Sequence, residues 1–256
     1  MHMKKRIGFV LSGGGVRCIA HLGILQALDD FGIRPDMISG TSGGAIAGAF
    51  YVAGYSCADI LRIIDEGHFF TFSNLLTPRQ GLFSMLGFEE IYRQYFPHNS
   101  FEALSIPLHM AATDIVKGEL SYFSTGNLTK SLLATSCIPF LFQPIAFQDT
   151  LYVDGGILNN FPIEPIQHSC DIMIGSHVNA LQQDVQKISM HQIVDRSFHL
   201  ALSSSVKSKA GACHLFIEPP NMTQFGVFDL KKTKEIFDYA YQYTCSLDSQ
   251  IKALLE

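Results

Sequence analysis

The sequence has 256 residues, which is enough for one large α/β domain with a sizeable hydrophobic core. Hydrophobic residues make up 47% of the chain and charged residues 16%, a composition typical of a globular protein on the apolar side. The formal net charge of -5 excludes the basic surface that nucleic-acid binding requires, so we expect no nucleic-acid partner. We predict a single domain over residues 1–256.

The six cysteines are scattered along the sequence, without a Cys-x-x-Cys pair or a Cys/His cluster at zinc spacing. This pattern predicts free thiols in a reducing cytoplasm, and we expect neither a metal ion nor a cofactor. The apolar run at residues 7–11 is too short for the hydrophobic core of a signal peptide. The expected location is therefore the cytoplasm, and the sequence leaves open a peripheral contact with the inner membrane surface.

The first predicted strand, at residues 5–11, is followed by a glycine-rich turn and a helix over residues 16–31. Three successive glycines, Gly13–Gly15, allow the backbone to turn its N–H groups toward an anion. A dinucleotide-binding Gly-x-Gly-x-x-Gly pattern would need glycine where Cys18 stands, and no Walker A lysine follows. An anion-binding loop and a plain tight turn remain the two interpretations.

The next stretch contains a Gly-x-Ser-x-Gly pattern at Gly40–Gly44. In hydrolases this pattern marks a nucleophile elbow, where a short buried strand turns sharply into a helix and presents a serine at the bend. Met37 and Ile38 are the predicted strand, and residues 45–52 are the predicted helix. Ser42 would then lie at a helix N-terminus, where unpaired amides and the helix dipole favour an oxyanion. The alternative is that Ser42 only caps the helix.

The segment from about residue 57 to residue 101 changes in character. Between Glu66 and Glu89, Arg79 is the one acidic or basic side chain, and phenylalanine is frequent. We predict a helical insertion that forms an aromatic-rich cap, which would receive acyl chains or touch a lipid surface. Ordinary core packing of the insertion is the alternative.

A strand at residues 148–154 delivers Asp154 onto a Gly-Gly turn. The other predicted strands lie at residues 107–115, 119–124, 171–176 and 214–217, and the other predicted helices at 57–66, at 128–137, from Pro162 onward, at 185–209 and at 229–255. Strands that alternate with helices imply a mainly parallel sheet covered on both faces, which is a three-layer α/β/α sandwich.

Four blocks of small and catalytic-type residues occur in one order along the chain. They are Gly13-Gly14-Gly15-Val16-Arg17, Gly40-Thr41-Ser42-Gly43-Gly44, Ala134-Thr135-Ser136-Cys137-Ile138-Pro139 and Tyr152-Val153-Asp154-Gly155-Gly156. Together they resemble the patatin-like phospholipases, and the resemblance extends from Gly13 to about Pro162. The third block matches least well because Thr135 stands between alanine and serine, which leaves the role of Ser136 open.

The resemblance implies a patatin/lysophospholipase-like fold with a Ser-Asp catalytic dyad. Ser42 would be the nucleophile and Asp154 the base that accepts its proton. The amides of Gly13–Gly15, with Arg17 nearby, would form the oxyanion hole. The implied reaction is hydrolysis of carboxylic ester bonds in phospholipids or lysophospholipids through an acyl-enzyme, and the sequence does not indicate an oligomeric state.

Two other interpretations remain open. A carboxylesterase or acyltransferase with a Ser-His-Asp triad would need a histidine, and five histidines follow Asp154: His168, His177, His191, His199 and His214. A non-catalytic lipid-binding protein on the same fold is the second alternative.

Overall fold

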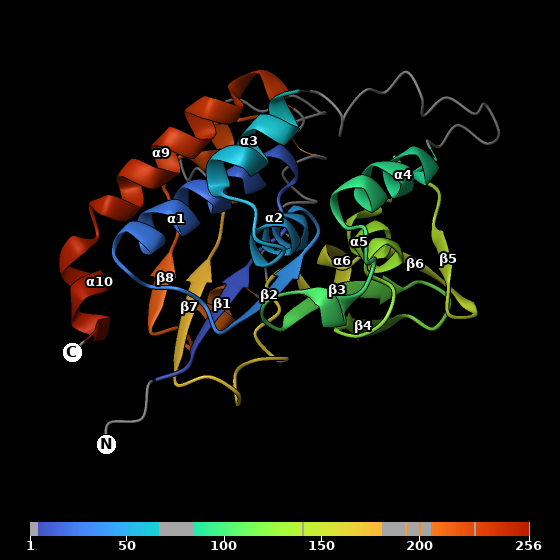
Figure 1. Cartoon of the computed structure of the whole chain (residues 1–256), viewed down its shortest axis with the longest axis horizontal. Helices are drawn as coiled ribbons and strands as arrows, with labels where there is room; N and C mark the ends of the chain where they lie inside the picture. Colours follow the sequence, from blue (N-terminus) through green and yellow to red (C-terminus); the bar gives the residue numbers. More distant parts are fainter. Residues whose placement is uncertain are drawn as a thin grey trace.

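In the computed structural model, the described residues are 5–66, 84–139, 141–180, 206–227 and 229–255, together with Ile193 and Leu200. They form an eight-stranded sheet in the order β5-β6-β3-β2-β1-β7-β8, with β4 beside β3 (Figure 1). The strands are β1 Ile7–Leu11, β2 Met37–Thr41, β3 Leu108–Asp114, β4 Glu119–Phe123, β5 Ile145–Phe147, β6 Thr150–Asp154, β7 Ile172–Ser176 and β8 Leu215–Ile217. The α-helices are α1 Ile19–Asp30, α2 Gly43–Val52, α3 Cys57–Asp65, α4 Leu86–Tyr95, α5 Leu128–Ser136, α6 Gly156–Asn159, α8 Val206–Ala210, α9 Thr233–Cys245 and α10 Asp248–Leu255. Short 3-10 helices are η1 Gly15–Cys18, η3 Phe101–Ala103, η4 Met222–Gln224 and η5 Leu230–Lys232.

The centre of the sheet is parallel, as the alternating pattern predicts. β3, β2, β1, β7 and β8 run in the same direction, whereas β4, β5 and β6 are antiparallel to their neighbours. The chain builds outward from β1 to β2 and β3, and later returns to the other side of β1 with β7 and β8. In open α/β sheets, ligands bind at the carboxyl ends of the strands where the strand order reverses in this way. That position is the end of β1, next to the glycine-rich turn.

Strand β3 brings two distant strands together. Along one edge it pairs with β4, and along the other edge it pairs first with β2 and then with β6. Thr41 at the end of β2 lies opposite Ala111, and Asp154 at the end of β6 lies opposite the next residue, Ala112. Because β2 is parallel and β6 antiparallel to β3, their carboxyl ends approach each other. This register places Ser42, the residue after Thr41, next to Asp154.

The side chains of β1 alternate between two cores, because successive residues of a strand point to opposite faces. Phe9 and Leu11 belong to the larger core, which α1, α2, α3 and α9 cover, and Figure 1 shows α1 and α9 packed side by side. Val10 belongs to a smaller core on the other face, with Ile163 and with Val206 of α8. The two covered faces confirm the predicted three-layer α/β/α sandwich.

The prediction of a helix from Pro162 onward is wrong, because residues 164–169 form turns instead. Pro165 has no N–H, so it cannot donate the helical hydrogen bond to the Phe161 carbonyl. That carbonyl instead accepts from the backbone N–H of Ile163 at 3.1 Å and from the Lys209 ammonium at 3.3 Å. The short strand β5 was also not predicted.

Of the aromatic-rich insertion, residues 57–66 and 84–101 belong to the described part of the chain, whereas residues 67–83 lie outside it. On either side, α3 and α4 pack into the larger core, where Ile60 and Tyr92 are buried. Most of the helix predicted at residues 185–209 also lies outside the described residues, and α8 overlaps the last part of that range. Within the described part of the chain, no helix is both long and apolar enough to cross a bilayer.

Candidate active site

Ser42 occupies a sharp turn between β2 and α2, as the nucleophile-elbow pattern predicts. Its backbone has φ 53° and ψ -128°, a region that residues with a side chain rarely adopt. The glycines on either side are required by close contacts. A Cβ on Gly40 would lie 2.9 Å from the Ala45 nitrogen, and one on Gly44 would lie 2.4 Å from the Ser12 carbonyl oxygen. Both distances are shorter than van der Waals contact, so the turn can close only with glycine at these positions.

The Ser42 side chain does not cap helix α2. Its hydroxyl instead lies beside the carboxylate of Asp154, close enough to lower the pKa of that group. The Ser42 backbone N–H donates to Thr135 Oγ1 at 3.0 Å, and the Thr135 hydroxyl in turn donates to the Ala111 carbonyl at 2.5 Å. Thr135 therefore links the serine turn to β3 through a side chain that accepts one hydrogen bond and donates another.

Asp154 ends β6 and is held by its neighbours on both sides. Its backbone N–H donates to the Cys137 carbonyl at 2.8 Å, and its carboxylate accepts the Gly156 N–H at 2.8 Å. The side chain is 8% exposed, and this burial raises the pKa of Asp154 to about 6, although hydrogen bonds from Ser42 and Gly156 act in the opposite direction. A carboxyl group with this pKa is ionised at neutral pH and is a stronger base than an exposed aspartate.

The glycine-rich loop lies beside Ser42, but its three amides differ in their partners. The Gly13 N–H donates to the Asn160 carbonyl at 3.2 Å, and the Gly13 carbonyl accepts from Asn179 Nδ2 at 2.6 Å. The amides of Gly14 and Gly15 have no hydrogen-bond partner among the described residues. Of the three predicted oxyanion-hole amides, these two are the ones available to a ligand.

Arg17 makes hydrogen bonds to Phe225 and Asn179. Its side chain is buried, with Nε donating to the Phe225 carbonyl at 2.8 Å and Nη1 to Asn179 Oδ1 at 3.5 Å. Because Asn179 also holds the Gly13 carbonyl, Arg17 supports the glycine-rich loop from behind. The basic residue of the first block is thus placed to orient the loop.

An apolar cavity of about 120 Å³ begins at Ser42 and Gly43. It follows one face of α2 past Ile46 and Ala47 to Phe50, a distance of about 12 Å at the helical rise of 1.5 Å per residue. Ile60 of α3 and Tyr92 of α4 also line the cavity, as do residues of η1, α1 and α5 and the side chains of Ile138, Leu141 and Phe142. The cavity has room for several methylene groups and offers almost no polar atoms to water.

Of the described histidines that follow Asp154, two form hydrogen bonds with groups other than Ser42. His177 Nδ1 lies 2.6 Å from Glu218 Oε1, and His214 Nδ1 accepts the Met173 N–H at 3.0 Å. His168 is exposed on the turns that follow Phe161, and His191 and His199 lie outside the described residues. In the part of the chain that the structure describes, no group of three His, Cys, Asp or Glu side chains is placed to hold a metal ion.

The structure places three residues around the site to which the sequence assigned no role, namely Thr135, Asn160 and Asn179. Each contacts a segment that is far away in the sequence, so no local spacing identifies its role. Thr135 stands inside the third block and Asn160 in the Leu158-Asn159-Asn160-Phe161-Pro162 stretch that continues the fourth block, whereas no pattern pointed to Asn179.

Comparisons with known proteins agree with these observations. The sequence model of the family described as patatin-like phospholipase matches residues 9–166. Lysophospholipase NTE1 of Coccidioides immitis is 25% identical over 275 residues, which cover 93% of this chain and 17% of that protein. An uncharacterised NTE family protein of Mycobacterium bovis is 31% identical over 184 residues, which cover 68% of this chain and 49% of that protein. This chain thus spans less than half the length of these relatives.

Solved structures show the same fold at low sequence identity. VipD from Legionella pneumophila superposes with a TM-score of 0.57 at 15% identity, covering 96% of this chain and 67% of that chain. Human GIVD cytosolic phospholipase A2 superposes with a TM-score of 0.51 at 10% identity, covering 97% of this chain and 59% of that chain. The family match takes in more than half of the chain, including the serine turn, the glycine-rich loop and the Asp-Gly-Gly turn. The chain belongs to the patatin-like phospholipase family.

Proposed function

We propose that this protein is a serine acyl hydrolase that cleaves carboxylic ester bonds of phospholipids or lysophospholipids. The observation that carries the proposal is the position of the Ser42 hydroxyl beside the Asp154 carboxylate, at the point where an apolar cavity begins. Membership of the patatin-like phospholipase family, and a relative named as a lysophospholipase, support a lipid ester as the substrate.

In the first step, Ser42 Oγ attacks the ester carbonyl carbon while Asp154 accepts the hydroxyl proton. The pKa of Asp154, raised by burial to about 6, makes the carboxylate a better base for this transfer and leaves it ionised at neutral pH. The bond from the carbonyl carbon to the glycerol oxygen then breaks, and Asp154 returns the proton to that oxygen. The products of this step are a free alcohol and an acyl group on Ser42.

In the second step, water attacks the acyl group and Asp154 accepts the water proton. The fatty acid leaves, and Ser42 recovers its proton. Both steps pass through a tetrahedral oxyanion, for which the unpaired amides of Gly14 and Gly15 are the available donors. One such donor is worth roughly 3 kcal/mol of transition-state stabilisation.

The apolar cavity suits the acyl chain of the substrate. Burying a methylene group contributes about 0.8 kcal/mol, so a chain that lies along Ile46, Ala47 and Phe50 would be bound firmly by an almost non-polar lining. The headgroup would remain outside, because the cavity offers it no hydrogen-bond partners. The cavity therefore favours an ester with a long alkyl chain over a small polar ester.

A Ser-His-Asp triad has less support. The Ser42 hydroxyl lies beside Asp154, whereas His177 contacts Glu218 and His214 accepts the Met173 N–H. Replacing each histidine in turn by glutamine separates the two mechanisms, since a dyad enzyme keeps its esterase activity in every variant.

Intact-mass labelling with an alkyl fluorophosphonate tests the proposal. We expect one adduct on the wild-type protein, none on Ser42→Ala and a much slower adduct on Asp154→Asn. Ser39→Ala is the matched control, because Ser39 is a buried serine of β2, the strand that leads to Ser42, and its hydroxyl has no partner among the described residues. Labelling that persists in Ser42→Ala, or a folded wild-type protein that is neither labelled nor active on lipid vesicles, would overturn the proposal.

A further inference from the structure

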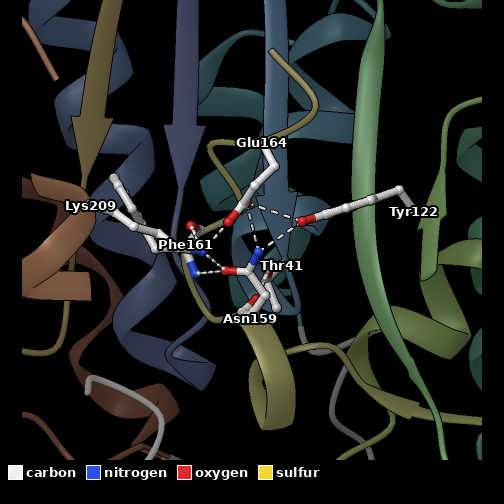
Figure 2. Close-up of polar contacts among 6 residues, drawn as sticks. All are labelled: Thr41, Tyr122, Asn159, Phe161, Glu164 and Lys209. Carbon is white, nitrogen blue, oxygen red and sulfur yellow. Dashed lines mark hydrogen bonds and ion pairs between the residues drawn. The ribbon is translucent and has the colours of Figure 1, made fainter. Parts of the chain in front are cut away.

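A cluster of polar side chains lies behind the serine turn, on the far side from the cavity. Figure 2 shows the carboxamide of Asn159 between the ammonium group of Lys209 and the hydroxyl of Tyr122. Asn159 Oδ1 accepts from Lys209 Nζ at 2.7 Å and from the Phe161 N–H at 3.2 Å. Asn159 Nδ2 donates to Tyr122 Oη at 2.9 Å and to Glu164 Oε2 at 2.8 Å. All four hydrogen-bonding positions of the carboxamide are therefore occupied.

The charged members of this cluster are paired with each other. Lys209 Nζ lies 2.5 Å from Glu164 Oε1, and the Tyr122 hydroxyl donates to Glu164 Oε2 at 3.0 Å. Although burial pushes the pKa of Glu164 upward, hydrogen bonds from Lys209 and Asn159 hold it below its usual value. A partly buried ion pair contributes little to stability, but it fixes the geometry of the groups that it contacts. Here the group that it fixes is the Asn159 side chain.

The backbone next to this side chain joins the three loops of the site. The Asn159 carbonyl accepts from Thr41 Oγ1 at 2.9 Å, one residue before Ser42. The Asn160 carbonyl accepts from the Gly13 N–H at 3.2 Å, in the glycine-rich loop. The Asn159 N–H donates to the Gly155 carbonyl at 2.8 Å, in the turn that follows Asp154. The backbone at residues 159–160 thus contacts the segments that carry the nucleophile, the base and the oxyanion donors.

We propose that Asn159, clamped by Lys209 and Glu164, is a positioning residue that sets the separation of Ser42, Asp154 and the glycine-rich loop. The proposal rests on the serine hydrolase function proposed above. Neither Asn159 nor Lys209 lines the acyl cavity. Loss of the clamp should therefore slow the chemical step and leave binding of the acyl chain unchanged.

Lys209→Met tests this proposal, because it removes the ammonium group and keeps an apolar stem of similar length. We expect kcat on a monoacyl phospholipid in mixed micelles, and the rate of fluorophosphonate labelling, to fall by about 10-fold, since small displacements of reacting groups carry penalties of this order. KM should stay within about 2-fold of the wild-type value, because the cavity lining is untouched. Lys207→Met is the matched control, as Lys207 is an exposed lysine of the same helix, and it should behave like the wild type.

Two further variants keep the test informative if Lys209→Met loses stability. Lys209→Arg preserves the cation, and it should recover most of the labelling rate. Tyr122→Phe removes one hydroxyl from the cluster and should slow labelling by about 3-fold, in line with loss of a modest hydrogen bond. Folded Lys209→Met protein that is labelled at the wild-type rate would overturn the proposal.

Hydrogen–deuterium exchange separates failure of this proposal from failure of the proposed function. In Lys209→Met, the peptide that contains Gly13 should exchange faster than in the wild type, because the Gly13 N–H donates to the Asn160 carbonyl. The peptide that contains Ser42 should also exchange faster, because the hydroxyl of the preceding Thr41 donates to the Asn159 carbonyl. Faster exchange confined to residues 159–164 and 206–210 would show a local structural role only and would overturn the proposal. This readout needs no catalysis, so it still decides on the positioning role if the wild-type protein hydrolyses no lipid.

Discussion

On the α2 side of Ser42 the protein presents an apolar cavity, whereas on the β6 side it presents polar groups joined by short hydrogen bonds. The cavity side is made by Ile46, Ala47 and Phe50, which contact a ligand only through dispersion and exclusion of water. The polar side is made by Asp154 and Thr135, which hold the serine hydroxyl and the serine N–H.

Substitutions on the two sides of Ser42 should therefore have different effects. Hydrophobic contacts are non-directional, so the cavity tolerates many chains that have the right width. Hydrogen bonds weaken steeply when their angles change, so the polar side permits only one arrangement of Ser42 and Asp154. We conclude that substitutions on the cavity side should alter which ester is cleaved, and that those on the polar side should alter how fast any ester is cleaved.

The largest expected effect comes from the polar side, with Asp154→Asn. Loss of a general base lowers kcat by about 10³-fold for short and long esters alike. The same change should raise stability near pH 8, because the folded protein then no longer holds a carboxylate in a site that disfavours charge. The pKa shift from 3.8 to about 6 is equivalent to roughly 3 kcal/mol.

The sign of this stability effect depends on pH. Between the unfolded pKa of 3.8 and the folded pKa of about 6, the folded wild-type protein binds more protons than the unfolded chain, so its stability falls as pH rises. Urea denaturation should therefore show Asp154→Asn to be more stable than wild type near pH 8, and the difference should vanish near pH 4. Asp114→Asn is the control of opposite sign, because hydrogen bonds from the Lys117 and Val116 amides and from Thr150 lower the pKa of Asp114. A stability difference that is the same at both pH values would contradict the prediction for Asp154.

The next effect comes from the cavity side, with Ala47→Leu. The larger side chain fills part of the space along α2, so hydrolysis of a twelve-carbon p-nitrophenyl ester should fall by about 10-fold relative to the four-carbon ester, in keeping with the 1–3 kcal/mol that steric overpacking costs. The fluorophosphonate labelling rate with a short alkyl probe should stay near the wild-type value. Ala53→Leu, at the exposed end of the same helix, controls for the substitution itself. A uniform loss on both esters would mean that the two sides of the site are not independent.

The smallest effect concerns the turn that separates the two sides. Ser42→Gly and Ser42→Ala should both be inactive, but the glycine variant should be more stable by about 1 kcal/mol, because glycine adopts the positive φ of this turn without strain. At Ser39, in the extended backbone of β2, the order should reverse, with alanine more stable than glycine. Thermal unfolding of the four variants makes this comparison, and an alanine variant as stable as glycine at position 42 would show that the turn is unstrained.

The sequence allowed the serine turn and the helix after it to be predicted better than the contacts of the polar side. Gly40–Gly44 and α2 are contiguous, so spacing and apolar pattern predict the turn, the helix and the position of Ser42. The contact of Thr135 with Ser42 and that of Asn159 with Thr41 join segments far apart in the sequence, and a single threonine or asparagine carries no periodic signal. Their positions follow from the register of β3 with its neighbours, which local pattern does not determine.

The fold likewise has parts that follow from local sequence pattern and parts that depend on contacts between distant segments. The parallel strands and their crossover helices follow from alternation of apolar segments, and the three-layer arrangement was predicted correctly. The helix predicted at Pro162 failed because a second proline, Pro165, removes a helical donor and because Lys209 binds the carbonyl that this donor would have used. The contact with Lys209 is tertiary, so no reading of the local sequence could supply it.

β2 and β6 pair with the same edge of β3 and reach it from opposite directions. This arrangement determines when the site is completed during synthesis. β2, which leads to Ser42, leaves the ribosome long before β6, which ends at Asp154. Ser42 and Asp154 therefore come together only after β6 has been synthesised and has joined β3. If these two residues act as we propose, the protein gains acyl-transfer activity only when most of the domain is in place.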